Sequence, residues 1–307
     1  MPLVIFDIDG TLTQTMNADA DCFVLSLAEV CGFRDVDTDW SSYKHATDSG
    51  VFHEIHQART GRPPSAFEIS QFRQHFVGLL EQISSEARIT AARGASLLLS
   101  RLAGSAEHRV ALATGAWRDS ARVKMACAGL CYDDYPAASS DDAFDRHSII
   151  RLSIERAAER YGRSGSTVYV GDGVWDARAC HRVGIPFIGI GAGSQATRLS
   201  AEGAVSVFPD FRDADTFLKS VDEIAAWPTQ GGAANPLDHP GCNSSVPRVG
   251  LLSLGRDTSE SEKTWRRALL RSPLPSGRRG VQRSAILLQR LGIPRLAQSL
   301  SIEKFSG

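Results

Sequence analysis

Short, largely apolar runs recur along the first two thirds of the chain, and each is followed at once by aspartate, threonine or glycine. The runs cover residues 3–6, 109–113, 166–170 and 186–190. Apolar runs of this length are typical of strands that are buried on both faces of a sheet. We therefore predict four central strands whose polar flanking residues gather at one edge.

Segments with helical spacing of apolar residues lie between these runs. They cover residues 94–103, 117–129, 147–161 and 175–183. Gly184 follows the last segment, which is typical of a helix C-terminus. Strands that alternate with helices predict an α/β fold with a doubly wound, mostly parallel sheet. Such sheets bind ligands at the carboxyl ends of their strands.

Residues 13–90 interrupt the alternation, because they contain helical patterns only. The predicted helices cover residues 17–31, 49–59 and 65–83. A buried helical core explains the spacing of Leu25 and Ala28 and that of Phe72 and Phe76. An all-helical insert directly after the first strand predicts a lid over the carboxyl edge of the sheet. The core domain is then expected to comprise residues 1–12 and 91–227.

From about Trp227 onward the pattern fails, because proline, glycine and serine come in quick succession. We predict a disordered tail at 228–307, with marginal helices near 260–271 and 281–291. The net charge of −1 conceals a balance of +7 in residues 229–307 and −8 in the rest. An arginine-rich tail can contact nucleic acid or anionic lipid. Its aromatic residues are too sparse for a stacking surface, so we favour a solvated appendage and expect no nucleic-acid partner.

The cysteines and the N-terminus indicate where the protein works. Six cysteines are present without a CxxC pair, and Cys127 and Cys131 have no second pair that would complete a zinc site. We interpret them as small buried residues in a reducing compartment. The sequence has neither an apolar run of about 18 residues nor a signal sequence. We expect a cytoplasmic protein without a membrane helix.

The strongest chemical signal is the hexapeptide Asp-Ile-Asp-Gly-Thr-Leu at residues 7–12, directly after the first predicted strand. Alternate residues of a strand point the same way, so Asp7 and Asp9 converge just beyond its end. The repulsion between two neighbouring carboxylates is unfavourable unless a cation or a shared proton offsets it. Oxygen ligands of this kind suit Mg²⁺. Gly10 permits a tight turn or a close approach of the backbone.

The hexapeptide resembles the first motif of the haloacid dehalogenase superfamily. The helical insert stands where the phosphoglycolate-phosphatase-like and β-phosphoglucomutase-like branch carries its cap domain. The resemblance implies that Asp7 is the nucleophile and Asp9 the general acid/base. It also implies that Mg²⁺ is bound at Asp7 and by the backbone carbonyl of Asp9. Gly10 and Thr11 are expected at the phosphate.

Two further segments resemble later motifs of the same superfamily. Thr114 and Gly115 follow a buried strand, where a hydroxyl and an adjacent backbone N–H can hold phosphate oxygens. The segment Gly-Asp-Gly-Val-Trp-Asp at 171–176 matches the fourth motif. The resemblance implies that Asp172 binds Mg²⁺ directly and that Asp176 binds it or orients its waters.

The third motif of the superfamily requires a Lys or an Arg before the last acidic strand. Arg146 opens the predicted helix 147–161 and is our candidate for this cation. Its charge would offset that of Asp7 and the phosphoryl group. Arg151 and Arg156 are the alternatives, although a solvated Arg is the ordinary case on so long a helix.

The polar loop at residues 45–50 has two interpretations. Thr47 and Asp48 can contact substrate as part of a cap loop. They can equally begin the following helix as N-cap residues without any substrate contact.

The resemblance implies a Mg²⁺-dependent phosphomonoester hydrolase that acts on a small phosphorylated metabolite through an aspartyl-phosphate. Phosphomutase or other phosphotransferase chemistry is the alternative. Dehalogenation is disfavoured, because halide leaves without a proton and does not need Asp9. A phospho-sensing protein would need neither the lid nor Asp9. The identity of the substrate and the oligomeric state stay open.

Overall fold

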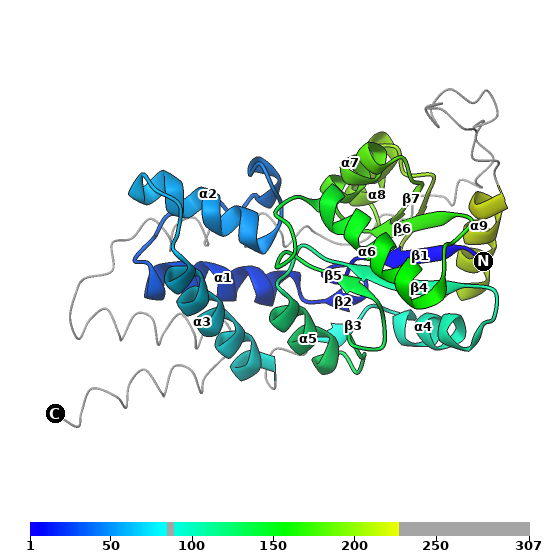
Figure 1. Cartoon of the computed structure of the whole chain (residues 1–307), viewed down its shortest axis with the longest axis horizontal. Coiled ribbons are helices and arrows are strands. Elements are labelled where there is room, and N and C mark those ends of the chain that lie inside the picture. Colours follow the sequence, from blue (N-terminus) through cyan, green and yellow to red (C-terminus); the bar gives the residue numbers. More distant parts are fainter. Residues whose placement is uncertain (85–88, 227–307) are drawn as a thin grey trace. The chain divides into compact units, whose positions relative to one another are not determined.

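A six-stranded parallel sheet forms the centre of the computed structural model, which describes residues 1–84 and 89–226 (Figure 1). In spatial order the strands are β5 (Ala137–Ala138), β4 (Arg109–Ala113), β1 (Leu3–Phe6), β6 (Thr167–Gly171), β7 (Phe187–Ile190) and β8 (Ser206–Phe208). The first strand of the chain is central, because Phe6 pairs with Leu112 on one side and with Val170 on the other. The doubly wound parallel sheet expected from the sequence is confirmed.

Both faces of the sheet are covered by helices, as the continuous apolar runs predict. One face packs against α4 (Ala95–Gly104), α5 (Arg118–Cys127) and α9 (Ala214–Ala226). The other face packs against α6 (Arg146–Tyr161), α7 (Val174–Val183) and α8 (Ser194–Ala201). In β1 the residues alternate between the two layers, so Val4 and Phe6 face the first and Leu3 and Ile5 the second. The loops that leave β1, β4 and β6 therefore start from a rigid, doubly covered platform.

Residues 13–91 form an excursion from the sheet that begins and ends in a short antiparallel ribbon. The ribbon consists of β2 (Thr13–Gln14) and β3 (Thr90–Ala91). Between them lie α1 (Met16–Val30), a 3₁₀ turn (Trp40–Ser42), α2 (Asp48–Thr60) and α3 (Ala66–Ser84). We call the helical segment 16–84 the cap. Figure 1 shows α1, α2 and α3 side by side, with α5 next to α3.

The cap has its own aromatic core, which one residue of the sheet domain completes. The rings of Phe52 and Phe72 stack with their centroids 4.3 Å apart, and Phe23 packs edge-on against Phe72 at 5.0 Å. Trp117 precedes α5 in the sheet domain, yet its ring stacks on Phe23 at 6.1 Å and is 1% exposed. Its indole nitrogen donates a hydrogen bond of 2.7 Å to Ser49 Oγ in α2. Trp117 therefore anchors the cap to the sheet domain.

The helices and strands predicted from apolar runs are all present, with ends displaced by at most two residues. The pattern of apolar residues does not predict β5, β8, α8, α9 or the β2–β3 ribbon. Their strands are two or three residues long, which is too short to produce a pattern. The tail at 228–307 and its expected helices lie outside the described residues. Among the described helices, none combines the length and the hydrophobicity that crossing a bilayer demands.

Candidate active site

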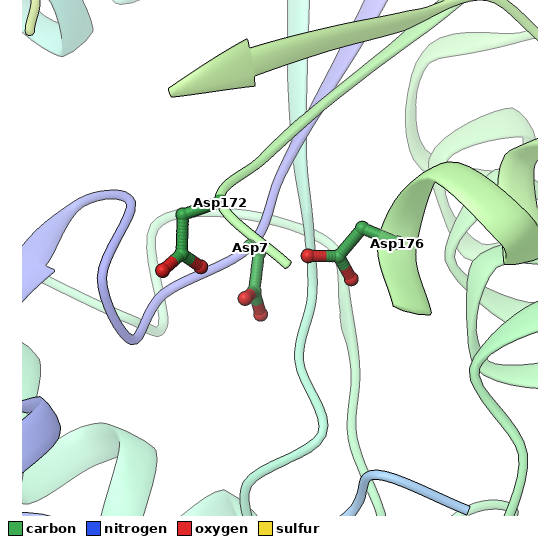
Figure 2. Close-up of side chains that lie close together, drawn as sticks. All are labelled: Asp7, Asp172 and Asp176. Carbon is green, nitrogen blue, oxygen red and sulfur yellow. The ribbon is translucent and has the colours of Figure 1, made fainter. Parts of the chain in front are cut away.

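Three aspartates meet at the carboxyl edge of the sheet. Asp7 follows β1, Asp172 follows the adjacent strand β6, and Asp176 lies in the first turn of α7. Because β1 and β6 are parallel and in register, their ends bring these residues together. Carboxylate oxygens of the three lie within 4.8 Å of one another. Figure 2 shows the side chains directed into one common space, with Asp7 between the other two.

The three carboxylates are almost fully withdrawn from water, and this changes their acidity. Burial raises the pKa of Asp7 to about 7, although the charge of Arg146 opposes the shift. Burial also raises the pKa of Asp172 well above its usual range, and it raises the pKa of Asp176. Three like charges in a low-dielectric space are unfavourable unless a cation joins them.

A divalent cation fits this arrangement. Asp7 Oδ1 is buried and accepts no hydrogen bond, although buried polar atoms are almost always satisfied. The available donors are three carboxylates, and hard oxygen ligands are those that Mg²⁺ prefers. The unsatisfied oxygen and the donor set therefore both agree with a divalent metal at Asp7, Asp172 and Asp176.

Arg146 is the cation that the structure brings to these carboxylates. It is the first residue of α6, and its Nη1 lies 2.7 Å from Asp176 Oδ1 and 3.2 Å from Asp7 Oδ1. The second contact is an ion pair without the geometry of a hydrogen bond. Burial alone would lower the pKa of Arg146, but the charges of Asp176 and Asp7 outweigh it and raise the pKa. Of the two alternatives, Arg156 pairs with Asp142 and Arg151 is exposed.

Gly10 and Thr11 form the turn that closes over Asp172. Gly10 has a φ of +76°, and a side chain there would collide with the carboxylate of Asp172. The Thr11 hydroxyl lies 3.5 Å from Asp172 Oδ1, at the limit of a hydrogen bond. Glycine is therefore required for both reasons that the sequence suggested, the positive φ and the close approach of the backbone.

Thr114 and Gly115 lie at the end of β4, directly beside β1. Thr114 is buried, and its hydroxyl accepts a hydrogen bond of 3.1 Å from the backbone of Ala116. A Cβ atom at Gly115 would lie 2.6 Å from the guanidinium of Arg146. The glycine therefore leaves the space in which Arg146 reaches Asp7.

Asp9 occupies a separate position beside the three carboxylates. Its Oδ2 accepts a hydrogen bond of 2.6 Å from Lys124 Nζ, and its Oδ1 accepts one from the hydroxyl of Thr15. Lys124 could not be recognised as a site residue from its local sequence, because a lysine in a short helix is normally solvated. One signal of its burial was available: on α5 it shares a helical face with Ser120 and Ala121, both of them buried.

The loop before α2 contacts two residues of the site, Gly115 and Arg146. Thr47 is the N-cap residue of α2, since its Oγ1 accepts a hydrogen bond from Gly50 N, and its hydroxyl also donates to Phe144 O at 2.6 Å. Asp48 Oδ2 accepts a hydrogen bond of 2.9 Å from the backbone of Trp117. Thr47 therefore caps α2, whereas Asp48 is the first residue of α2 and binds the backbone of Trp117; contact of either residue with substrate stays a prediction. The loop reaches the site through Asp48 N, which donates to Gly115 O at 2.8 Å.

Asp48 makes a pH-dependent contribution to stability. Desolvation and the nearby charge of Asp19 raise the pKa of Asp48 to about 8, while Lys124 opposes the shift. An unfolded Asp has a pKa of about 3.9, so the folded protein binds this proton more tightly. The contribution of this proton to the free energy of unfolding is fully present below about pH 4. It decreases as the pH rises from about 4 to about 8 and does not change further above about pH 8.

We therefore expect Asp48→Asn, which carries no charge and keeps an acceptor for Trp117, to abolish this decline. The difference in unfolding free energy between the variant and the wild type should grow in favour of the variant between about pH 5 and about pH 8. Urea titrations at several pH values measure it. Asp215→Asn is the matched control, because its side chain is 86% exposed. Parallel pH profiles for Asp48→Asn and the wild type would contradict the expectation.

Comparison with known proteins places the chain in a family. A sequence profile described as haloacid dehalogenase-like hydrolase matches residues 1–184, whereas a search of curated proteins finds no significant match. A hydrolase from Pseudomonas syringae is similar in structure, with 21% identity, a TM-score of 0.57 and coverage of 74% of this chain and 100% of that one.

Two further solved structures share the fold. CbbY from Rhodobacter sphaeroides, in complex with phosphate, has 18% identity and a TM-score of 0.52, and the match covers 68% of this chain and 94% of that one. A putative β-phosphoglucomutase from Bacteroides vulgatus has 15% identity and a TM-score of 0.54, with 74% and 90% covered. The motifs at the sheet edge, the profile and the fold agree: the chain belongs to the haloacid dehalogenase-like hydrolases.

Proposed function

We propose that the protein is a Mg²⁺-dependent phosphomonoester hydrolase that acts on a small phosphorylated metabolite. The observation that carries this proposal is the state of Asp7: a buried carboxylate oxygen without a hydrogen-bond donor, flanked by Arg146 and two further aspartates. One oxygen of this carboxylate can attack phosphorus and form an aspartyl-phosphate, which divides one displacement into two easier steps, while the other oxygen stays available to a metal. The CbbY structure, with phosphate bound on the same fold, supports a small phosphorylated ligand.

The proposed metal would be held by Asp7, Asp172, Asp176 and the backbone carbonyl of Asp9. When bound, it would neutralise phosphoryl oxygens and relieve the repulsion among the three carboxylates. Arg146 would balance the remaining negative charge, since it lies within ion-pair distance of both Asp7 and Asp176. Fixed charges of this kind stabilise a transition state without reorganisation.

The remaining proposed roles concern the leaving group and the exclusion of water. Asp9 lies two residues beyond the nucleophile and would give a proton to the departing alcohol, then take one from the attacking water. Thr114 would position a phosphoryl oxygen from the end of β4. The loop before α2 already contacts Gly115 and Arg146, and a closed loop of this kind keeps bulk water from the reaction.

Metal removal tests the proposal directly. We expect release of phosphate from p-nitrophenyl phosphate and from one or more members of a panel of phosphorylated metabolites. Chelation by EDTA should lower the rate by about a thousandfold, because a catalytic metal supplies several kcal/mol to the transition state. Added Mg²⁺ should restore the rate. It should also raise the melting temperature, because a cation that binds the folded state stabilises it.

Two results would count against this function. The first is a rate that is insensitive to the chelator, and the second is a failure to release phosphate from any ester of the panel. Transfer of the phosphoryl group to another hydroxyl of the substrate, without release of phosphate, would indicate a phosphomutase.

A further inference from the structure

A fully buried lysine joins the sheet domain to the cap. Lys124 lies on α5 and is 0% exposed. Its Nζ donates hydrogen bonds of 2.6 Å to Asp9 Oδ2 and 2.8 Å to Asp19 Oδ1 in the first turns of α1. Lysine is almost never fully buried unless it is paired. None of the roles proposed above uses this side chain.

The buried ammonium is held firmly by the charges around it. Burial by itself would lower the pKa of Lys124, but the carboxylates of Asp19, Asp9 and Asp48 outweigh burial and raise the pKa. Lys124 is therefore a charged group without access to water, and its carboxylate partners fix its position. Removal of one member of such a group leaves the others uncompensated.

The orientation of Asp9 is fixed at both of its oxygens. Lys124 occupies Oδ2, and the hydroxyl of the buried Thr15 occupies Oδ1. Thr15 is held in turn by the hydroxyl of Thr13 at 3.2 Å, within the ribbon region. Each carboxylate oxygen has a second acceptor site, so Asp9 can still exchange a proton with a substrate. Only its freedom to rotate is removed.

We propose that Lys124 is a positioning residue that holds Asp9 in the orientation for proton transfer and, through Asp19, ties this orientation to the cap helix α1. This role presupposes the proton-transfer function proposed for Asp9. Lys124 is not expected to touch the phosphoryl group, because its ammonium is engaged by Asp9 and Asp19. The position of the cap and the geometry of proton transfer are thereby coupled through one side chain.

The role has a consequence that a merely structural lysine would not have. A p-nitrophenolate ion leaves without needing a proton, whereas an alkoxide needs one. If Lys124 acts through Asp9, its loss should impair the hydrolysis of alkyl phosphates selectively. A general loss of structure would slow both classes of ester to a similar degree.

The experiment compares kcat/KM for p-nitrophenyl phosphate and for the best alkyl phosphate of the panel. For Lys124→Met we expect about a tenfold to hundredfold loss on the alkyl ester and less than about a threefold loss on the aryl ester. Asp9→Asn should show the same selectivity more strongly. In the double variant, Lys124→Met should add no further loss on the alkyl ester, because the group that it positions is already gone. Lys219→Met, whose side chain is 77% exposed, is the matched control and should match the wild type on both esters.

Asp19→Asn provides a second variant, because it keeps the size of the side chain and removes only its charge. It should show a smaller loss of kcat/KM with the same selectivity for the alkyl ester. It therefore tests the role of Lys124 even if Lys124→Met does not fold. Equal losses on the two esters for Lys124→Met, or additive losses in the double variant, would overturn the role of Lys124 while the proposed hydrolase function stands. A wild-type protein that hydrolyses neither ester would instead overturn the proposed function.

Discussion

Asp7→Asn should reduce the turnover of p-nitrophenyl phosphate by about 10⁴-fold to 10⁶-fold, the range for loss of a nucleophile. Asn keeps the volume of the side chain, but its amide cannot attack phosphorus and carries no charge for a cation. The fold should be retained, because Asp7 Oδ1 makes no hydrogen bond that the variant would lose. The rate of phosphate release and a circular dichroism spectrum together provide the measurement.

A covalent trap distinguishes the proposed nucleophile from a residue that only binds metal. Rapid acid quenching of the wild type during turnover should yield a peptide containing Asp7 that carries one phosphoryl group, and Asp7→Asn should yield none. Asp215→Asn, at an exposed acidic position, serves as the control for an Asp-to-Asn change. Substantial turnover by Asp7→Asn, or a phosphorylated peptide elsewhere in the chain, would contradict the mechanism.

Trp117→Ala should lower the free energy of unfolding by about 3–5 kcal/mol, the range for a large aromatic residue removed from a packed core. Trp117 is almost fully buried and packs between Phe23, Phe72 and Phe76, with ring centroids 5.8–6.1 Å away. Its removal leaves a cavity where the cap meets the sheet domain. Urea unfolding followed by circular dichroism measures the loss.

Two further variants test the interpretation of Trp117 as the anchor of the cap. Phe67→Ala, at an aromatic residue that is 69% exposed, should change the stability by no more than about 0.5 kcal/mol. Trp117→Phe keeps an aromatic ring but loses the hydrogen bond to Ser49, and should cost about 1 kcal/mol. If Trp117→Ala is no more destabilising than Phe67→Ala, the packing of Trp117 between the domains does not contribute as described.

The sequence predicts most of the fold because strands buried on both faces of a parallel sheet appear as continuous apolar runs. The run at residues 3–6 is apolar on both faces, and the polar residues after it must lie at the sheet edge. Asp7 and Asp172 converge because β1 and β6 are adjacent and parallel, and Asp176 joins them from the first turn of α7. Arg146 could be nominated from its place at the start of a helix, but its distance from Asp7 depends on how α6 packs.

Lys124 and Trp117 could not be predicted in the same way, because their roles arise from contacts between distant segments. Lys124 meets Asp9 and Asp19, which stand more than a hundred residues earlier in the chain. The pattern of α5 can place Lys124 on the buried face of the helix, but it does not show which carboxylates the ammonium meets. From the sequence, Trp117 is an ordinary apolar residue before a helix. Only the structure shows that the aromatic residues of the cap pack around it.

The central position of β1 has a consequence for the order in which the protein can assemble. Leu3 is synthesised well before both of its strand partners, Arg109 and Thr167. While the chain emerges from the ribosome, the cap helices appear long before β6, and their contacts with one another span a shorter stretch of sequence than the pairing of β1 with β6. A nascent chain can therefore form its cap helices before β6 is synthesised and brings Asp172 beside Asp7.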